Sequence, residues 1–364
     1  MTTVAVVGAG LLGSAVADEL AGAGARVTVL EAGRPGGGTS GASFAWINAQ
    51  DKAPTDYFEL NAEGVAAYPA LARSLGGDWY HPGGDLAIGR GSGAAKVAGK
   101  LERHRALGYP VRELDRAAVL ALEPGLELPS DREFRAAHFP DEAWIDAPQL
   151  VERRLARAAG FGALVRVASA VTGFDRVGDR VTGARTDSGA VAADIVVLAA
   201  GPASEGLAGL AGVRLPMSPS PGLLATTEPA EVTLSHVVHD GDVAIRPDGP
   251  GRILLSSREV DASLDPSIRE LAPDSAPCDE LLARARRLVP ALRDVRVDHV
   301  RVGVRSVASD GLPVAGYAPG IEGLYLLVAH SGATLAAVLG RLVASELLGH
   351  HEGKLESWRP ARFG

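Results

Sequence analysis

Three closely spaced glycines and a following acid are the residues best suited to chemistry. Gly8, Gly10 and Gly13 separate a short apolar run from a helical stretch, and Glu31 closes the next apolar run. Gly8 permits a tight turn, Gly10 lets a pyrophosphate approach the backbone, and Gly13 lets the helix pack closely. The helix N-terminus offers N–H groups to phosphates, and Glu31 can accept hydrogen bonds from a ribose. The pattern predicts a dinucleotide site without a 2′-phosphate, against the alternative of a glycine-rich loop with no ligand.

A second turn of small residues lies near the other end of the chain. The apolar run 324–330 continues through 331–334 into a final helix. The N-terminus of that helix is a second end that stabilises anions. Between the two turns, a glycine-rich loop carries hydroxyl groups on Thr39, Ser40 and Ser43. This loop either continues around an extended ligand or is a plain surface loop. Two such helix ends suit a long ligand with phosphates in its middle and a polar ring.

Predicted strands must hold these turns in place. Residues 4–7 and 27–31 flank the first glycine turn, and the fully apolar run 195–198 is typical of a buried parallel strand. Small residues follow that run and let a ligand lie against the backbone. Between 216 and 255, apolar runs separated by Pro and Gly predict antiparallel strands, with a hairpin over 245–255. The predicted fold class is α/β, with a Rossmann-like domain and a second domain built on a mixed antiparallel sheet.

Composition narrows the function further. The chain has 364 residues, which suggests about two structural units, and its net charge of −8 gives no support to nucleic-acid binding. The single cysteine, Cys278, cannot form an internal disulfide or a cysteine-based metal site, and we expect no metal. No apolar run approaches the ~20 residues of a membrane span, and no signal peptide precedes the first predicted strand. We therefore expect a cytoplasmic protein without a membrane partner.

Blocks along nearly the whole chain resemble the D-amino-acid oxidase superfamily of flavoproteins, nearest its glycine oxidase and sarcosine oxidase branch. The glycine motif is common to many flavin and nicotinamide proteins, whereas the later blocks are more specific. In the family's order, the matching segments are 8–13 with Glu31, 39–46, 81–84, 144–146, 197–201, 245–255, 303–316 and 329–340.

The resemblance implies an FAD cofactor that lies along these segments. The FAD is expected to be non-covalent, because the stretch 306–310 lacks the cysteine that tethers the flavin in sarcosine oxidase-like relatives. The implied domain division is 1–76, 145–215 and 301–364 for FAD and 77–144 and 216–300 for substrate. The implied cofactor-binding residues are Gly8, Gly10, Leu11, Leu12, Gly13, Glu31, Ala32, Thr39, Ser40, Phe44, Ala45, Trp46, Val171, Ala200, Gly201, His330, Ser331, Gly332, Ala333, Thr334 and Leu335.

Arg305 falls on the family arginine that pairs with the substrate carboxylate. A planar guanidinium grips a carboxylate with two parallel hydrogen bonds, which would fix the substrate Cα–H over flavin N5. Hydride transfer then gives an imine that hydrolyses, and the step needs alignment more than a general base. The alternative is a surface arginine, since Arg293, Arg296 and Arg301 are close in sequence.

The chain departs from the glycine oxidase pattern in ways that enlarge the pocket. Ala244 replaces a tyrosine that caps the carboxylate, and a second arginine after the final strand is absent. Trp46 is expected to form an apolar wall. These changes predict a substrate bulkier than glycine, an N-substituted glycine cleaved to glyoxylate and an amine. His81 either faces the substrate or caps a turn, and Asn48 is a further pocket candidate.

Several functions remain open on the sequence alone. The leading interpretation is an oxidase that passes electrons to O2 and forms H2O2. The alternative is a D-amino-acid or sarcosine-type FAD dehydrogenase with a non-oxygen acceptor. A tRNA-modifying or non-redox flavoprotein is disfavoured by the acidic charge, and a pure binding module is disfavoured because every cofactor-facing block is present.

Overall fold

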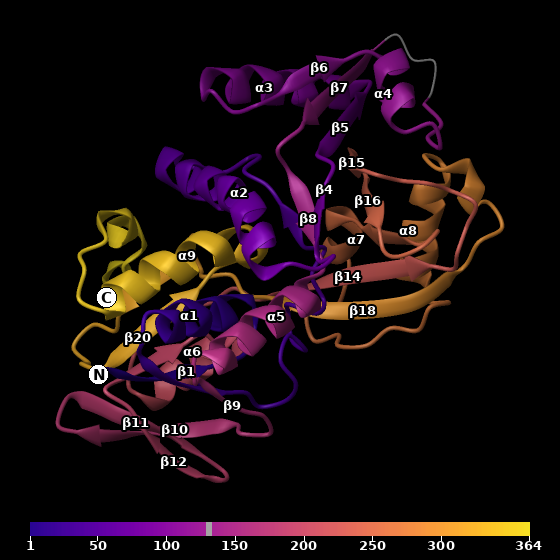
Figure 1. Cartoon of the computed structure of the whole chain (residues 1–364). Helices are drawn as coiled ribbons and strands as arrows, with labels where there is room; N and C mark the ends of the chain where they lie inside the picture. The colour runs from indigo at the N-terminus through magenta and orange to yellow at the C-terminus, as the bar shows by residue number, and fades with distance from the viewer. Residues whose placement is uncertain (129–132) are drawn as a thin grey trace.

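The computed structural model describes residues 1–128 and 133–364, and two large sheets dominate it (Figure 1). The first sheet has six strands in the order β19-β20-β13-β1-β2-β9. All pair in parallel except β19, which is antiparallel to β20. The bounds are β1 Thr3–Val7, β2 Arg26–Leu30, β9 Leu164–Arg166, β13 Ile195–Leu198, β19 Val314–Tyr317 and β20 Leu324–Val328.

Helices cover one face of this sheet. The helices are α1 (Leu11–Gly22), α5 (Ala147–Gly160) and α9 (Gly332–Leu347), and α2 (Thr55–Leu75) packs on α9 (Figure 1). The apolar spacing of residues 55–75 explains α2, whose buried face includes Tyr57 and Tyr68. Close packing of α1 on α9 requires a glycine, because a Cβ at Gly340 would lie 2.8 Å from the Ala15 side chain.

The other face carries a three-stranded sheet of β10 (Val171–Val177), β11 (Arg180–Thr186) and β12 (Gly189–Ala192), with η1 (Gly201–Ala203) and α6 (Ser204–Leu210). Both faces of the parallel sheet are therefore buried, which explains why β1, β13 and β20 are almost wholly apolar.

The second large sheet has eight strands in the order β18-β14-β17-β16-β15-β5-β7-β6. Neighbours are antiparallel except β15 and β5, which confirms a mixed sheet. The predicted hairpin is β16 and β17. The strands are β5 Asp85–Arg90, β6 Arg112–Leu114, β7 Phe134–Phe139, β14 Ser220–Thr227, β15 Val237–Asp240, β16 Val243–Pro247, β17 Ile253–Ser256 and β18 Val297–Arg305.

Short helices cover this sheet, and a small sheet connects the two halves. The helices are α3 (Ser92–Ala106), α4 (Arg116–Leu122), α7 (Arg258–Ala262), α8 (Ala276–Arg286) and η2 (Pro290–Leu292). The small sheet is β3 (Trp46–Ile47), β8 (Ala143–Ile145) and β4 (Tyr80–Pro82), and the chain ends in η3 (Gly353–Trp358) and η4 (Pro360–Phe363).

The predicted α/β fold class is confirmed. The domain boundary predicted at residue 301 falls within β18, which stays in the eight-stranded sheet as far as Arg305. Arg305 therefore belongs to the eight-stranded sheet. It is the last residue of β18, which ends where this sheet meets the six-stranded one. Within the described residues, no helix combines the length and apolarity that a membrane crossing needs.

Candidate functional site

Two of the three glycines in the first turn have no room for a side chain. Gly8 has a φ of +98°, and a Cβ there would lie 2.6 Å from the carbonyl oxygen of Ala199 on the neighbouring strand. A Cβ at Gly13 would overlap the carbonyl oxygen of Gly8. The Leu11 N–H donates to Ser40 Oγ at 3.0 Å, which joins the predicted hydroxyl loop to the start of α1. This backbone is shaped for close approach of a ligand.

Glu31 closes the same turn with its carboxylate. Its two oxygens accept hydrogen bonds from the Ala9 and Gly33 N–H groups, each at 2.8 Å. The Glu31 carbonyl accepts from Ser169 N–H at 2.8 Å, which brings Val171 at the start of β10 to this end of the sheet. A carboxylate has further lone pairs, so the predicted contact with a ribose is compatible with both bonds. Ala32, beside it, is exposed.

The second small-residue turn lies next to the first. Ser331 is the N-cap of α9, and no side chain caps that helix. A Cβ at Gly332 would lie 4.0 Å from Leu12 Cγ, so the two helix N-termini are neighbours. Thr334 Oγ1 accepts a hydrogen bond from the Asn48 N–H at 3.1 Å. Both helices begin at the carboxyl ends of parallel strands, where open α/β sheets bind their ligands.

The predicted flavin loop is attached to the large sheet close to Arg305. Thr39 Oγ1 donates to the Val304 carbonyl at 2.6 Å. Gly201 has a φ of +59°, and a Cβ there would lie 3.1 Å from Ser306 Oγ. The ends of β13 and β18 and the loop therefore converge at one place. The two neighbouring helix N-termini and the glycines without room for side chains fit a long dinucleotide such as FAD.

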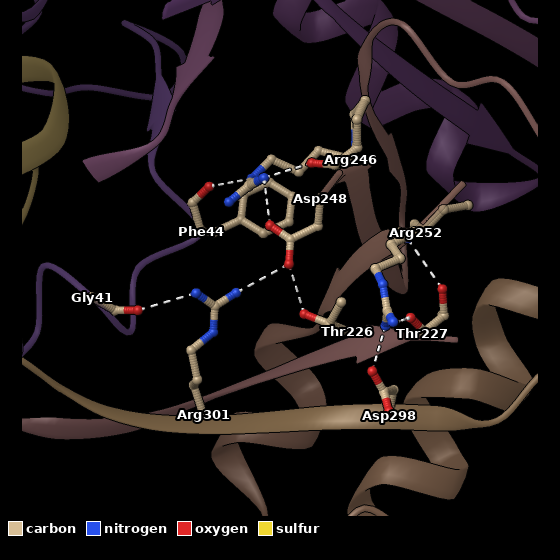
Figure 2. A network of polar contacts seen from close by, with 11 residues as sticks. Gly41, Phe44, Thr226, Thr227, Arg246, Asp248, Arg252, Asp298 and Arg301 are labelled. Carbon is tan, nitrogen blue, oxygen red and sulfur yellow. Dashed lines mark hydrogen bonds and ion pairs between the residues drawn. The ribbon is translucent and has the colours of Figure 1, made fainter. Parts of the chain in front are cut away.

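Two arginines that were not predicted as site residues hold the rest of this loop (Figure 2). Arg246 Nε donates to the Phe44 carbonyl at 2.8 Å, and Arg301 Nη1 donates to the Gly41 carbonyl at 3.2 Å. Both arginines also reach Asp248, at 3.2 and 3.3 Å. Burial lowers the pKa of Arg246 to about 10, so it remains charged at neutral pH. The network holds the backbone at Gly41 and Phe44, directly before Ala45 and Trp46.

Arg305 lies flat across β14 instead of pointing into solvent. A Cβ at Gly222 would lie 2.8 Å from its Nη2, so the glycine makes room for the guanidinium. Arg305 Nη1 donates to the Pro221 carbonyl at 2.6 Å, and Nη2 forms an ion pair with Asp261. Asp261 is buried and also accepts from the Leu223 N–H at 2.7 Å. The remaining guanidinium N–H groups stay available to a ligand.

Trp46 is held from two sides. Its Nε1 donates to Glu142 at 3.0 Å, and its ring centroid lies 4.2 Å from that of His239. His239 Nδ1 is 2.5 Å from a carboxylate oxygen of the buried Asp85. Ala244 pairs directly with His239 across β15 and β16, so its small side chain leaves space beside the two rings. Nothing in the sequence marks His239, because its neighbours come from other segments.

Asn48 and His81 occupy different places. Asn48 is buried, and its side-chain amide donates to the Trp46 carbonyl at 3.3 Å. Its backbone N–H donates to Thr334 Oγ1 and so ties the loop to α9. His81 stacks on Trp144 with ring centroids 3.7 Å apart. The guanidinium carbon of Arg246 lies 4.3 Å from the centroid of the same Trp144 ring. The structure therefore places His81 in a stack with Trp144 on the small sheet.

Gly10 offers a test of cofactor binding that leaves the fold intact. A Cβ at this position would meet only Ser40 Oγ, at 3.0 Å. Gly10→Ala should therefore fold but weaken FAD binding by about tenfold or more, because the methyl group occupies the approach to the backbone. Titration of FAD into stripped protein measures this. Gly206→Ala, at a position with nothing within 4 Å of a Cβ, is the matched control and should bind FAD normally.

Comparisons with known proteins agree with this geometry. The sequence profile described as FAD dependent oxidoreductase matches residues 3–346. The glycine oxidase of Pseudomonas aeruginosa is 30% identical, with 95% of this chain and 94% of that protein covered. The crystal structure of glycine oxidase from Geobacillus kaustophilus superposes with a TM-score of 0.86, at 26% identity and 100% and 99% coverage. That of iminodiacetate oxidase from Chelativorans sp. BNC1 has a TM-score of 0.84, at 25% identity and 98% coverage of both chains. The chain therefore belongs to the DAO family of FAD-dependent oxidoreductases and is a glycine oxidase-like amino-acid oxidoreductase, as its sequence predicted.

Proposed function

We propose that this protein oxidises an N-substituted glycine larger than glycine itself, with Arg305 as the anchor of the substrate carboxylate. The observation that carries the proposal is the setting of Arg305. Its guanidinium is held over Gly222 by the Pro221 carbonyl and Asp261, at the junction of the two sheets. A guanidinium held in this way presents its remaining donors in one orientation, which suits bidentate binding of a carboxylate.

Room for an N-substituent is expected beside Ala244. This residue pairs with His239 on one side and with Ser256 on the other, so its methyl group stands between an imidazole ring and a short hydroxyl side chain. Trp46 and His239, whose rings are tilted by 40° to each other, supply an aromatic surface next to that space. Iminodiacetate, named as the substrate of one structural neighbour, is itself an N-substituted glycine.

FAD, when bound, would accept two electrons as the hydride of the substrate Cα–H, while the amine nitrogen loses a proton. Water would then hydrolyse the imine product to glyoxylate and a primary amine. The role of this chain is to orient and to stabilise charge. Arg305 would fix the carboxylate, and the uncapped N-terminus of α9 would face the ring edge where negative charge develops. Burial, with the charges of Lys52, Arg305 and Arg258, lowers the pKa of His330 to about 4, so His330 is neutral at pH 7.

Product analysis tests the reaction and the electron acceptor together. With an N-alkylglycine and air, we expect glyoxylate, the primary amine and H2O2 in equal amounts, as an oxidase produces. Turnover only with an artificial acceptor would assign the D-amino-acid or sarcosine-type dehydrogenase instead. Absence of glyoxylate with every N-alkylglycine, in protein that carries FAD, would contradict the proposal.

A further inference from the structure

Lys52 is held in the loop between β3 and α2 and directed toward the start of α9. Its carbonyl accepts a hydrogen bond from Arg103, which fixes the backbone. Its Nζ lies 5.9 Å from the centroid of the Tyr57 ring. The Tyr57 hydroxyl lies 2.8 Å from Ser331 Oγ, next to His330. These contacts place an ammonium group beside the second anion-stabilising turn.

Arg258 brings a second cation to the same region from the large sheet. It is the first residue of α7, the short helix whose Asp261 pairs with Arg305. Burial is the main cause that lowers the pKa of Lys52 to about 8, and the charge of Arg258 comes next. Lys52, Arg305 and Arg258 all act on His330. Arg258 stands three residues before Asp261 in α7, so it lies one helical turn from the carboxylate that pairs with Arg305.

The charges in this region do not balance within the described part of the chain. Asp261 pairs with Arg305, and Asp51, whose charge attracts both Lys52 and Arg258, forms its own ion pair with Lys100. Four cations (Lys52, Lys100, Arg258 and Arg305) therefore share two aspartates, and no ion pair within the described residues joins Lys52 or Arg258 to either of them. The nearby Glu142 attracts Lys52, but burial and Asp85 raise the pKa of Glu142 and disfavour its charged form. Like charges held close together are unfavourable until an anion lies between them.

We propose that the N-substituent of the substrate carries a second carboxylate, which Lys52 and Arg258 bind while Arg305 binds the glycine carboxylate. The substrate class is then a dicarboxylic secondary amino acid. This inference rests on the proposed function and uses the same balanced two-electron oxidation, with glyoxylate and an amino acid as the products. An arginine and a lysine suit such a carboxylate because both keep their positive charge at neutral pH.

A matched pair of substrates tests this directly. N-(2-carboxyethyl)glycine and its side-chain amide have nearly the same size, and only the acid carries the second charge. With the FAD-loaded enzyme, kcat/KM for the acid should exceed that for the amide by about tenfold or more. Lys52→Met and Arg258→Met should each lower kcat/KM for the acid about tenfold and leave that for the amide within about twofold. Arg293→Met, which removes an exposed charge elsewhere, should change neither.

The outcomes separate the two claims. Equal kcat/KM values for acid and amide, both unaffected by the Lys52 and Arg258 variants, would overturn the second carboxylate and leave the oxidation of N-substituted glycines standing. If neither compound reduces the flavin, the proposed function fails as well. If kcat/KM is higher for the acid than for the amide, and only Lys52→Met and Arg258→Met remove this difference, the site for the second carboxylate is established.

The pH dependence gives a second readout. The acid-to-amide ratio of kcat/KM should fall as the pH rises through about 8, because Lys52 then loses its charge. Lys52→Arg keeps its charge and should hold the ratio constant to higher pH. A ratio that falls equally in Lys52→Arg would contradict the assignment. The charged or titratable groups that face Lys52 are Asp51, Tyr57, Lys100, Glu142, Arg258 and His330.

Discussion

Replacing Arg305 with methionine is expected to lower kcat/KM for an N-substituted glycine about 30- to 1,000-fold. Under the proposed function, the variant removes the charge that binds the substrate carboxylate, and such a loss costs about 2–4 kcal/mol. Asp261 loses its ion pair but keeps the bond from the Leu223 N–H, so the fold should survive. Steady-state kinetics on FAD-loaded protein measures the effect. Arg305→Lys should recover only part of it, because an ammonium cannot bind bidentately.

Gly222→Ala provides a sharper version of this test. The added methyl group meets only the far end of the Arg305 side chain, whose nearest atom is Nη2 at 2.8 Å. The strand should therefore form, while the guanidinium is displaced. We expect a higher KM with less change in kcat for Gly222→Ala, and normal kinetics for Arg296→Met, which removes an exposed charge near the start of β18. Wild-type kinetics in Arg305→Met would show that another group binds the carboxylate.

The largest effect on stability is expected at Glu142. This buried side chain accepts hydrogen bonds from Trp46 Nε1 at 3.0 Å, Gln50 Nε2 at 2.9 Å, the Tyr109 hydroxyl at 3.1 Å and the Ala49 N–H at 3.3 Å. Glu142→Leu removes the acceptor that these donors share, although Gln50 keeps its bond to Asp85, and it should lower the free energy of unfolding by about 3–5 kcal/mol. Denaturant unfolding measures it, and the fluorescence of Trp46 should change as its ring is released.

Glu142→Gln is the matched control, because it keeps the shape and one acceptor oxygen. Burial and Asp85 raise the pKa of Glu142 above its ordinary value of 4.5, so the folded protein holds this proton more tightly than the unfolded chain. Stability should therefore fall as the pH rises above about 4.5, and Glu142→Gln should reduce that dependence. A loss under 1 kcal/mol in Glu142→Leu would contradict this account of the network.

The parts of the site that could be predicted from sequence are those whose geometry is local. The turn at Gly8, the place of Glu31 at the end of the second strand, and α2 follow from neighbouring residues and helical spacing. The eight-stranded order was not predictable, because β5 pairs with β15 from a distant segment.

Asp261, Lys52 and Arg258 were not predicted as site residues, because each comes from a segment far from the motifs in sequence. Asp261 is set beside Arg305 by a five-residue helix that carries no functional motif. Lys52 and Arg258 lie far apart in sequence, and each alone resembles an ordinary surface cation. Their charges lower the pKa of His330 only in the folded chain, because the three residues come from separate segments.

The most direct test of the central claim is anaerobic mixing of the FAD-loaded protein with glycine, sarcosine, D-amino acids and N-substituted glycines while the flavin absorbance is followed. Oxidation of an N-substituted glycine must bleach the flavin without any other acceptor. We expect the fastest bleaching with a bulky N-substituted glycine and much slower bleaching with glycine. Faster bleaching by glycine or a small D-amino acid than by any bulky N-substituted glycine would contradict the enlarged pocket beside Ala244.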